Sequence, residues 1–293
     1  VEGSETITVT LDSITSGDAD ISIGGANSDT VTIADNDSAT WGISGSTTVD
    51  EGNNATYTVS LAGTLESGET ATIDLGLADI DTTSADYANF VTAVNTAIGS
   101  RPDLAFDGTT LTYTGDGNAM ANLVITLGTV GDAITENDEQ FSVSLSNPGS
   151  TTGASILGTG SETTTITDDD AATLAIDDVT VAEGVCGTMT VTFSVTLTGD
   201  VQGGVAVNYA TADGTAVAGS DYVGTSGTLN FAGTDGGVET FTVTINGDET
   251  VELDETFLAN LSSIVAAGDV TFTDNQGEAT ITTDDAATLS IDD

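Results

Sequence analysis

Basic residues are almost missing from this 293-residue chain, which has no histidine, no lysine and a single arginine, Arg101. Without histidine, the chain can build neither a Ser-His-Asp or Cys-His catalytic centre nor a histidine-ligated zinc site. Without lysine, it cannot form a Schiff base. One cation cannot neutralise a run of phosphates, so the composition excludes nucleic acid as a direct partner. We therefore expect a protein that is not an enzyme and does not bind DNA or RNA.

Cysteine, proline and long apolar runs are scarce as well. Cys186 is the single cysteine, so no disulfide can form within the chain. Two prolines, 35 glycines and abundant Thr and Val are typical of short strands joined by turns. No apolar stretch approaches the roughly 20 residues of a membrane-spanning helix, so we expect no direct membrane insertion in this segment.

Acidic residues, in contrast, number 47, and the formal net charge is −46. Hydrophobic residues make up 38% of the chain, which is too many for a disordered acidic tail. So many carboxylates with almost no internal cations need an external counterion. A divalent metal is one candidate, and a salt-adapted surface of solvated turn acids is the alternative.

Internal repeats organise the chain. Residues 33–43, 166–176 and 281–291 align with one another, and the acidic motif at 132–141 matches that at 248–257 at every spacing. The tail of this motif also occurs at residues 2–7. The pattern predicts the end of one repeat (1–38), two whole repeats (39–170 and 171–285) and the first strand of a further repeat (286–293). Such a chain would be a window on a longer tandem array.

Apolar and polar residues alternate within each repeat, as in Phe141, Val143 and Leu145. Alternation indicates strands with one buried face, and about seven such runs per repeat predict a two-sheet sandwich. Between Ser84 and Gly99 the apolar residues instead fall at helical spacing, which predicts one short helix inserted in the first whole repeat, begun by Ser84 and ended by Gly99. We expect Trp41 to be a core residue.

Taken together, these motifs resemble the Calx-beta domain, which is known from sodium–calcium exchangers, integrin β4 and very large bacterial surface and secreted proteins. The resemblance rests on an ordered set that occurs twice: Glu-Gly, then Asp-Tyr, then Asp-x3-Glu-x-Asp-Glu-x-Phe, then a terminal cluster of Asp. It implies an all-β fold of tandem immunoglobulin-like (Calx-beta) β-sandwiches. It also implies that Ca²⁺ is bound by acids that meet at one end of each sandwich.

The resemblance assigns candidate metal ligands residue by residue. In the first whole repeat they are Glu51, Asp86, Asp132, Glu136, Glu139, Asp168, Asp169 and Asp170. In the second they are Glu183, Asp221, Asp248, Glu252, Glu255, Asp284 and Asp285. Asp35 and Asp37 stand at the equivalent place in the first boundary.

The chain departs from the exchanger-type motif at several of these places. Gly131 and Gly247 each stand where that motif has a second acid, Thr283 stands where Asp168 stands one repeat earlier, and Asn36 separates Asp35 from Asp37. Each departure removes a charged ligand, so we expect fewer or weaker ions at the first and last boundaries.

The acids at 168–170 lie where one repeat leads directly into the next, and ions there would stiffen the joint. We expect an extracellular or cell-surface structural protein, a calcium-stiffened array forming a stalk, fibre or sheath of a prokaryotic adhesin. Its partners would be calcium ions and neighbouring repeats or like subunits. The alternative is a calcium-sensing or ligand-binding module, lectin-like or adhesive, of a larger cell-surface protein.

Overall fold

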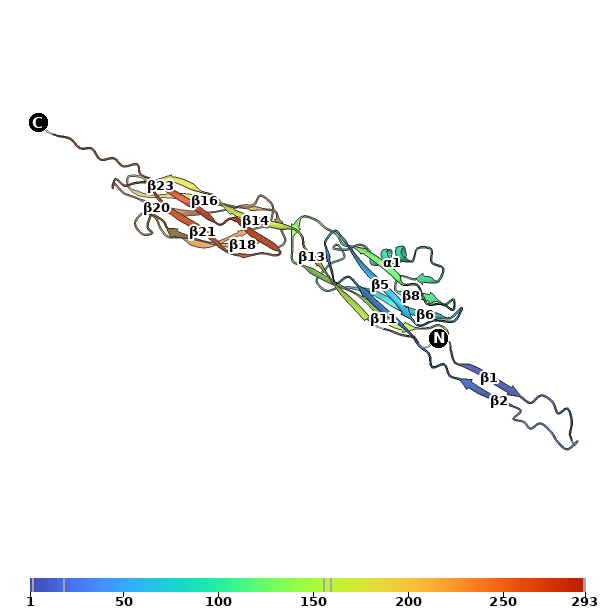
Figure 1. Ribbon diagram of the computed structural model, residues 1–293. Coiled ribbons are helices and arrows are strands. Elements are labelled where there is room, and N and C mark those ends of the chain that lie inside the picture. Colours follow the sequence, from blue (N-terminus) through green and yellow to red (C-terminus); the bar gives the residue numbers. More distant parts are fainter. Residues whose placement is uncertain (2, 18, 155, 159, 292–293) are drawn as a thin grey trace. The chain divides into compact units, whose positions relative to one another are not determined.

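The computed structural model describes residues 1, 3–17, 19–154, 156–158 and 160–291. Within these residues it is made of short strands and one short helix (Figure 1). Glu2 of the N-terminal motif, and Asp292 and Asp293 of the predicted first strand of a further repeat, lie outside the described residues. The chain divides into two compact units, one of Val1–Gly131 with Glu139–Thr167, and the other of Asp132–Asp138 with the residues from Asp168 onward.

Two sheets form the sandwich of the first unit. In the described part of the chain, the larger sheet has the order β4-β13-β11-β6-β8-β7, and the smaller has the order β12-β3-β5-β9. The larger sheet contains β4 (Thr48–Asp50), β6 (Thr70–Asp79), β7 (Leu104–Phe106), β8 (Thr110–Thr114), β11 (Glu139–Gly149) and β13 (Gly160–Thr167). The smaller contains β3 (Ala39–Gly45), β5 (Asn54–Ala62), β9 (Leu123–Gly128) and β12 (Ile156–Leu157).

The second unit repeats this plan. Among its described residues, one sheet has the order β20-β16-β14-β22 and the other β15-β23-β21-β18-β19. The first of these contains β14 (Ala171–Ile176), β16 (Gly187–Thr198), β20 (Val238–Gly247) and β22 (Asp269–Asp274). The second contains β15 (Val179–Ala182), β18 (Val205–Asp213), β19 (Ser226–Phe231), β21 (Glu255–Val265) and β23 (Gln276–Thr282). A short parallel pair, β10 (Ile134–Thr135) with β17 (Asp200–Val201), belongs to the same unit.

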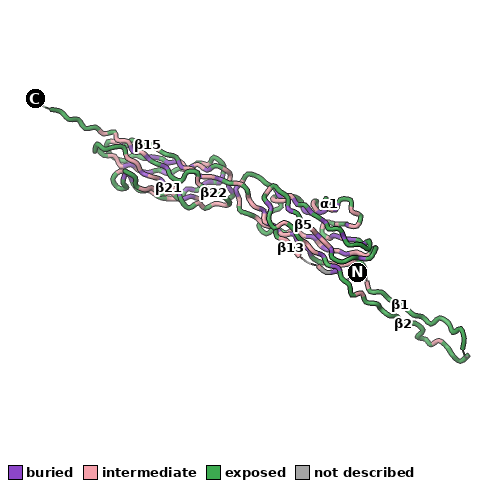
Figure 2. Tube along the Cα trace, in the orientation of Figure 1, coloured by how far each residue is buried: buried purple, intermediate pink, exposed green. Residues whose placement is uncertain are grey.

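Alternation along the strands decides what each sandwich buries (Figure 2). In β11, Phe141, Val143 and Leu145 point into the core of the first unit, while the serines between them are half-buried. Trp41 is only 2% exposed, which confirms the prediction that it is a core residue. The prediction of tandem all-β sandwiches with one inserted helix is also confirmed.

The helix α1 (Phe90–Ile98) begins later than the apolar spacing after Ser84 predicts. Asn89, not Ser84, is its N-cap, and the Asn89 side chain accepts a hydrogen bond from the Thr92 amide at 2.9 Å. The residues before it form a turn instead, in which Asp86 accepts hydrogen bonds from both the amide and the hydroxyl of Thr83. Gly99 ends the helix as predicted, with a φ of 55° that favours glycine.

The segments outside the two sandwiches are a hairpin and a tail. The strands β1 (Glu5–Thr10) and β2 (Ser28–Ile33) pair antiparallel, with Glu5 opposite Ile33, just as Glu139 lies opposite Ile166 in the complete sandwich. Residues 283–291 form no strand in this structure, and the Leu289 and Ile291 side chains there are exposed. No helix among the described residues has the length and apolarity needed to cross a membrane.

Candidate metal centre

Seven of the predicted ligands lie at one end of the second unit, because the strands that carry them end or begin there. Glu183 follows β15, Asp248 follows β20, and Asp284 and Asp285 follow β23. Glu255 begins β21 and pairs with Ile281 near the end of β23. The remaining two, Asp221 and Glu252, stand in the loops that precede β19 and β21. The β-sandwich thus gathers acids that are up to about a hundred residues apart in sequence.

Three of these acids come close enough to share one ion. Carboxylate oxygens of Asp221, Glu252 and Glu255 all lie within 4.8 Å of one another. Burial raises the pKa of Glu255 above its ordinary value, and the negative charges of Asp221 and Glu252 raise it further. Like charges at this separation repel one another unless a cation lies among them.

A second part of the cluster surrounds Glu183, which is the one buried acid among the described residues, at 7% exposure. Burial raises the pKa of Glu183 most, and the charges of Asp248, Glu252, Asp285 and Asp284 add to the effect. Burial likewise raises the pKa of Asp285, followed by the charge of Asp284. Glu252 influences both Glu183 and Glu255, so the two parts form one continuous cluster.

Backbone amides hold several of these carboxylates in place. The Thr250 amide donates to Asp248, which lowers the pKa of that carboxyl, and the Gly184 amide donates to Asp284 Oδ1 at 3.1 Å. Gly247 touches the same turn: a Cβ added there would lie 2.1 Å from the Gly184 carbonyl oxygen. The second acid of the exchanger-type motif therefore cannot stand at Gly247 in this backbone arrangement.

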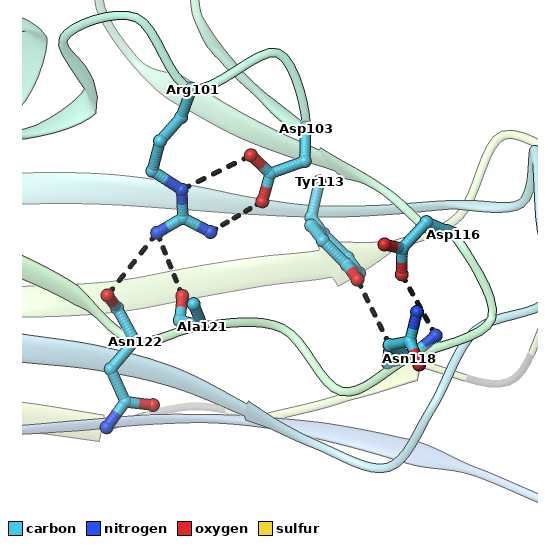
Figure 3. Close-up of polar contacts among 7 residues, drawn as sticks. All are labelled: Arg101, Asp103, Tyr113, Asp116, Asn118, Ala121 and Asn122. Carbon is cyan, nitrogen blue, oxygen red and sulfur yellow. Dashed lines mark hydrogen bonds and ion pairs between the residues drawn. The ribbon is translucent and has the colours of Figure 1, made fainter.

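The donor set of this end fits a hard divalent cation. Asp285 Oδ2 is buried without a hydrogen-bond partner, and an orphaned buried carboxylate oxygen is costly unless a cation contacts it. The acids supply only oxygen ligands, which calcium prefers in sets of about six to eight. The single arginine does not neutralise these acids. Arg101 belongs to the first unit, where it pairs with Asp103 and donates to the carbonyls of Ala121 and Asn122 (Figure 3).

A smaller acidic group surrounds the residues at 168–170. Asp168 accepts hydrogen bonds from the amides of Glu136 at 3.1 Å and Asp170 at 3.4 Å, and burial raises the pKa of its carboxyl. Carboxylate oxygens of Asp132 and Asp170 lie within 4.8 Å of each other. Asp170 Oδ2 is buried without a hydrogen-bond partner, as is Asp285 Oδ2 at the equivalent position one repeat later.

Comparison with known families identifies this arrangement. The sequence model of the Calx-beta domain matches residues 53–170 and again residues 172–287, which together make up most of the chain. The chain belongs to the Calx-beta family. The Calx-beta resemblance noted from the sequence motifs is therefore confirmed.

Several solved structures are similar to this Calx-beta chain. The apo form of the Calx CBD1 domain is 30% identical, with coverage of 39% of this chain and 98% of that one, at a TM-score of 0.34. A structure of CBD12 from CALX1.2 is 18% identical and covers 82% of this chain and 99% of its own, also at a TM-score of 0.34. No curated protein matches the chain.

The remaining predicted ligands stand on separate turns and strands. Within the first Calx-beta unit, Glu51 lies in the turn after β4, where its amide donates to the Thr167 carbonyl at 3.1 Å. In the described part of the chain, Asp86 and Glu139 belong to no group of three acids with oxygens within 4.8 Å, unlike their equivalents Asp221 and Glu255. Among the described residues, Asp35, Asp37 and Asp169 belong to no such group either. Asp35 accepts a hydrogen bond from the Asp37 amide.

The ligand motifs do not include one acid in each Calx-beta unit, which accepts a hydrogen bond from the tyrosine of the Asp-Tyr pair. Tyr222 is 1% exposed and donates its hydroxyl to Asp213 Oδ1; burial and this bond raise the pKa of Tyr222 to about 12. Tyr87 makes the same bond to Asp79. An Asp that recurs eight or nine residues before each Asp-Tyr tyrosine is the signal that could have revealed this pair.

Proposed function

We propose that this Calx-beta chain is a non-enzymatic, calcium-binding structural protein. The observation that carries the proposal is the acidic end of the second unit, where a buried carboxylate oxygen of Asp285 lacks a partner and the pKa values of three acids are raised together. The residues that would hold Ca²⁺ there are Glu183, Asp221, Asp248, Glu252, Glu255, Asp284 and Asp285.

When bound, calcium supplies positive charge that replaces repulsion among these acids with attraction. The protein's own contribution is position: strand ends present the carboxylates, and the amides of Gly184 and Thr250 fix two of them. Because the acids follow, precede or begin five different strands, an ion held by them would tie those strand ends to one another. The expected result is a stiffer sandwich rather than a chemical reaction.

The finer assignment is an extracellular stalk, fibre or sheath of a prokaryotic surface adhesin. Three considerations support it. Millimolar calcium outside cells suffices for weak sites. A lysine-free chain with one arginine, itself engaged in an ion pair, offers trypsin-like proteases almost no cleavage site. Tandem sandwiches joined without a proline or a Gly-Ser run between residues 167 and 171 suit a mechanical role.

Thermal unfolding tests the calcium-binding core of this proposal. Binding to the folded state alone adds RT ln(1 + [L]/Kd), about 2.7 kcal/mol per site at a hundredfold excess over Kd. The Tm should therefore rise from EDTA to millimolar calcium. Sodium chloride of matched ionic strength is the control, and if it restores the Tm as fully as calcium does, charge screening is sufficient and the proposal is wrong.

A ligand-binding module is the second candidate, and one feature of the first unit favours it. A groove of about 510 Å³ lies beside the start of α1, lined in part by Leu77, Tyr87, Phe90 and Val91. The equivalent helix is absent from the described part of the second unit, so this repeat differs from its neighbour. Screening the whole chain on glycan and peptide arrays in calcium tests the candidate: binding that Val91→Glu abolishes supports it, and no binding at all counts against it.

A further inference from the structure

The strand β20 (Val238–Gly247) forms one edge of a sheet in the second unit, where β16 is its one neighbouring strand among the described residues. The loop that carries Asp221 covers one part of its outer side. The Val223 amide donates to the Thr244 carbonyl at 2.8 Å, and the Asn246 amide donates to the Asp221 carbonyl at 2.9 Å. Thr244 and Asn246 therefore direct their backbone groups away from β16.

The rest of this edge is open. Backbone direction alternates along an antiparallel strand, so Val238, Thr240 and Thr242 point the same way as Thr244. No described residue donates to or accepts from their outward amides and carbonyls. Their side chains are exposed as well, and Val238 is 53% exposed. Three donors and three acceptors of an extended strand are thus available to another strand.

The equivalent edge in the first unit, β9, is covered by this chain itself. A loop makes the same two backbone bonds at the end of β9, and α1 packs beside the strand with Val94 and Ile98 buried. The cover comes from residues 88–109, which contain α1 and β7. In the second unit only residues 223–225 separate Tyr222 from β19. The edge of β20 is therefore open because this internal connection is short.

The open edge carries no charge, although the chain has 47 acids and one arginine. Val238, Thr240 and Thr242 are neutral, and the neighbouring edge strand β19 contains no acid. Of the other edge strands in this unit, β22 begins and ends with an Asp, and β15 leads into Glu183. A copy of the same chain is repelled wherever its acids meet those of the first, so the uncharged edge is where two copies can approach.

We propose that two copies of this chain pair antiparallel through β20, about a two-fold axis at Thr240. In this register Thr240 lies opposite Thr240 of the second copy, and Val238 lies opposite Thr242. Each of the three facing pairs exchanges two hydrogen bonds, so every outward amide and carbonyl of the open edge is bonded. A register shifted by two residues would place Val238 opposite Thr244, whose carbonyl already accepts from Val223, and would form fewer bonds.

The side chains agree with this register. Threonine faces threonine at the axis, which stabilises an antiparallel pair. Glu239, the one acid of β20, lies opposite Phe241 of the second copy, so like charges do not face each other. At about one hydrogen bond per 100–200 Å², the three facing pairs correspond to an interface of roughly 600–1,200 Å², the low end of specific interfaces. We expect a weak dimer that closes on itself and does not extend into a fibre.

Sedimentation velocity of the whole chain from about 1 μM to about 1 mM tests the pairing. The solvent contains about 0.5 M sodium chloride, which screens the acidic loops. None of the predicted calcium ligands lies in β20, so the dimer should form equally in calcium and in EDTA. Thr240→Glu places two carboxylates opposite each other and should raise the dissociation constant about tenfold. Thr190→Glu is the matched control, because it adds the same charge to an exposed position on the inner strand β16, and it should dimerise as the wild type does.

A cysteine at the axis tests the register. In a Cys186→Ser background, Thr240→Cys places two thiols in a facing pair whose Cα atoms are about 5.5 Å apart, within reach of a disulfide. Mild oxidation should convert this variant to a covalent dimer. Thr190→Cys in the same background is the control and should stay a monomer.

Circular dichroism establishes that each variant is folded, and a calcium titration is recorded separately. A wild-type chain that is monomeric at about 1 mM overturns the pairing, as do equal dissociation constants for the two glutamate variants. Equal cross-linking of the two cysteine variants overturns the register and with it the proposal. None of these outcomes changes the calcium titration, so failure of the pairing and failure of the proposed function are distinguishable.

Discussion

Tyr222 donates its phenolic hydroxyl to Asp213 Oδ1 at 2.7 Å, beneath the loop that carries Asp221. The Tyr222 ring stacks on Phe257 at a centroid distance of 4.3 Å, and Phe257 lies opposite Asp213 in the pairing of β18 with β21. Phe257 stands two residues after Glu255 on β21. One tyrosine therefore ties the Asp221 loop to the strand that presents Glu255.

Removing this hydroxyl should loosen the loop. Tyr222→Phe deletes a hydrogen bond to a charged acceptor, which contributes about 1.5–3 kcal/mol, so we expect a lower Tm in calcium and weaker calcium binding. Tyr209→Phe is the matched control, because Tyr209 also stacks on a phenylalanine but its hydroxyl has no hydrogen-bond partner among the described residues. Equal Tm losses in the two variants would contradict the role of the Asp213 bond.

The calcium-free protein should become more stable as the pH is lowered toward about 5. Glu183, Glu255 and Asp285 all have a pKa raised in the folded state, first by burial and then by neighbouring acids. The ordinary pKa values are 4.5 for Glu and 3.8 for Asp. At a pH between these values and the raised pKa values of the folded state, the folded state binds more protons than the unfolded state. Stability therefore falls as the pH rises through that window. Thermal unfolding in EDTA from pH 7 to pH 5 measures the slope, and calcium should flatten it; a Tm that falls steadily on acidification would contradict the expectation.

Neutralising Glu252 should have opposite effects with and without calcium. Its charge raises the pKa of both Glu183 and Glu255, so Glu252→Gln relieves repulsion and should raise the Tm in EDTA. The same change removes a charged ligand and should weaken calcium binding about tenfold. Glu278→Gln, an exposed acid on β23, is the control and should change neither quantity. A variant that loses stability in EDTA would show that Glu252 is held by structural bonds instead.

The turn beside Glu183 should not tolerate a side chain at Gly247. A Cβ there would lie 2.1 Å from the Gly184 carbonyl oxygen and 2.8 Å from that of Glu183. We expect Gly247→Ala to cost about 1–3 kcal/mol of the free energy of unfolding, because the two turns must separate. Gly25→Ala, where nothing lies within 4 Å, is the control for adding a methyl group. Chemical denaturation of both variants gives the comparison.

Much of the fold could be predicted from local pattern. Alternation of apolar residues depends only on the two-residue period of a strand, so Phe141, Val143 and Leu145 were assigned to the core correctly. The start of α1 could not be predicted in this way. Ser84 and Asn89 both suit an N-cap, and the choice falls to Asn89 because the intervening Tyr87 bridges to Thr129, which takes it out of the helix.

For the site, the repeated motifs indicated which acids to consider, and nothing in them indicated which would meet. Asp221, Glu252 and Glu255 converge because the pairing of β21 with β18 and β23 brings distant loops to one end. The sequence by itself determined the repeats, the strand period, the charge and the oxygen chemistry of the ligands, since these depend on residue type and spacing. Only the tertiary structure decided that Asp221 and Glu255 share a group of three acids while Asp86 and Glu139, at the same motif positions, join none among the described residues, because such contacts depend on how each loop packs and not on residue spacing.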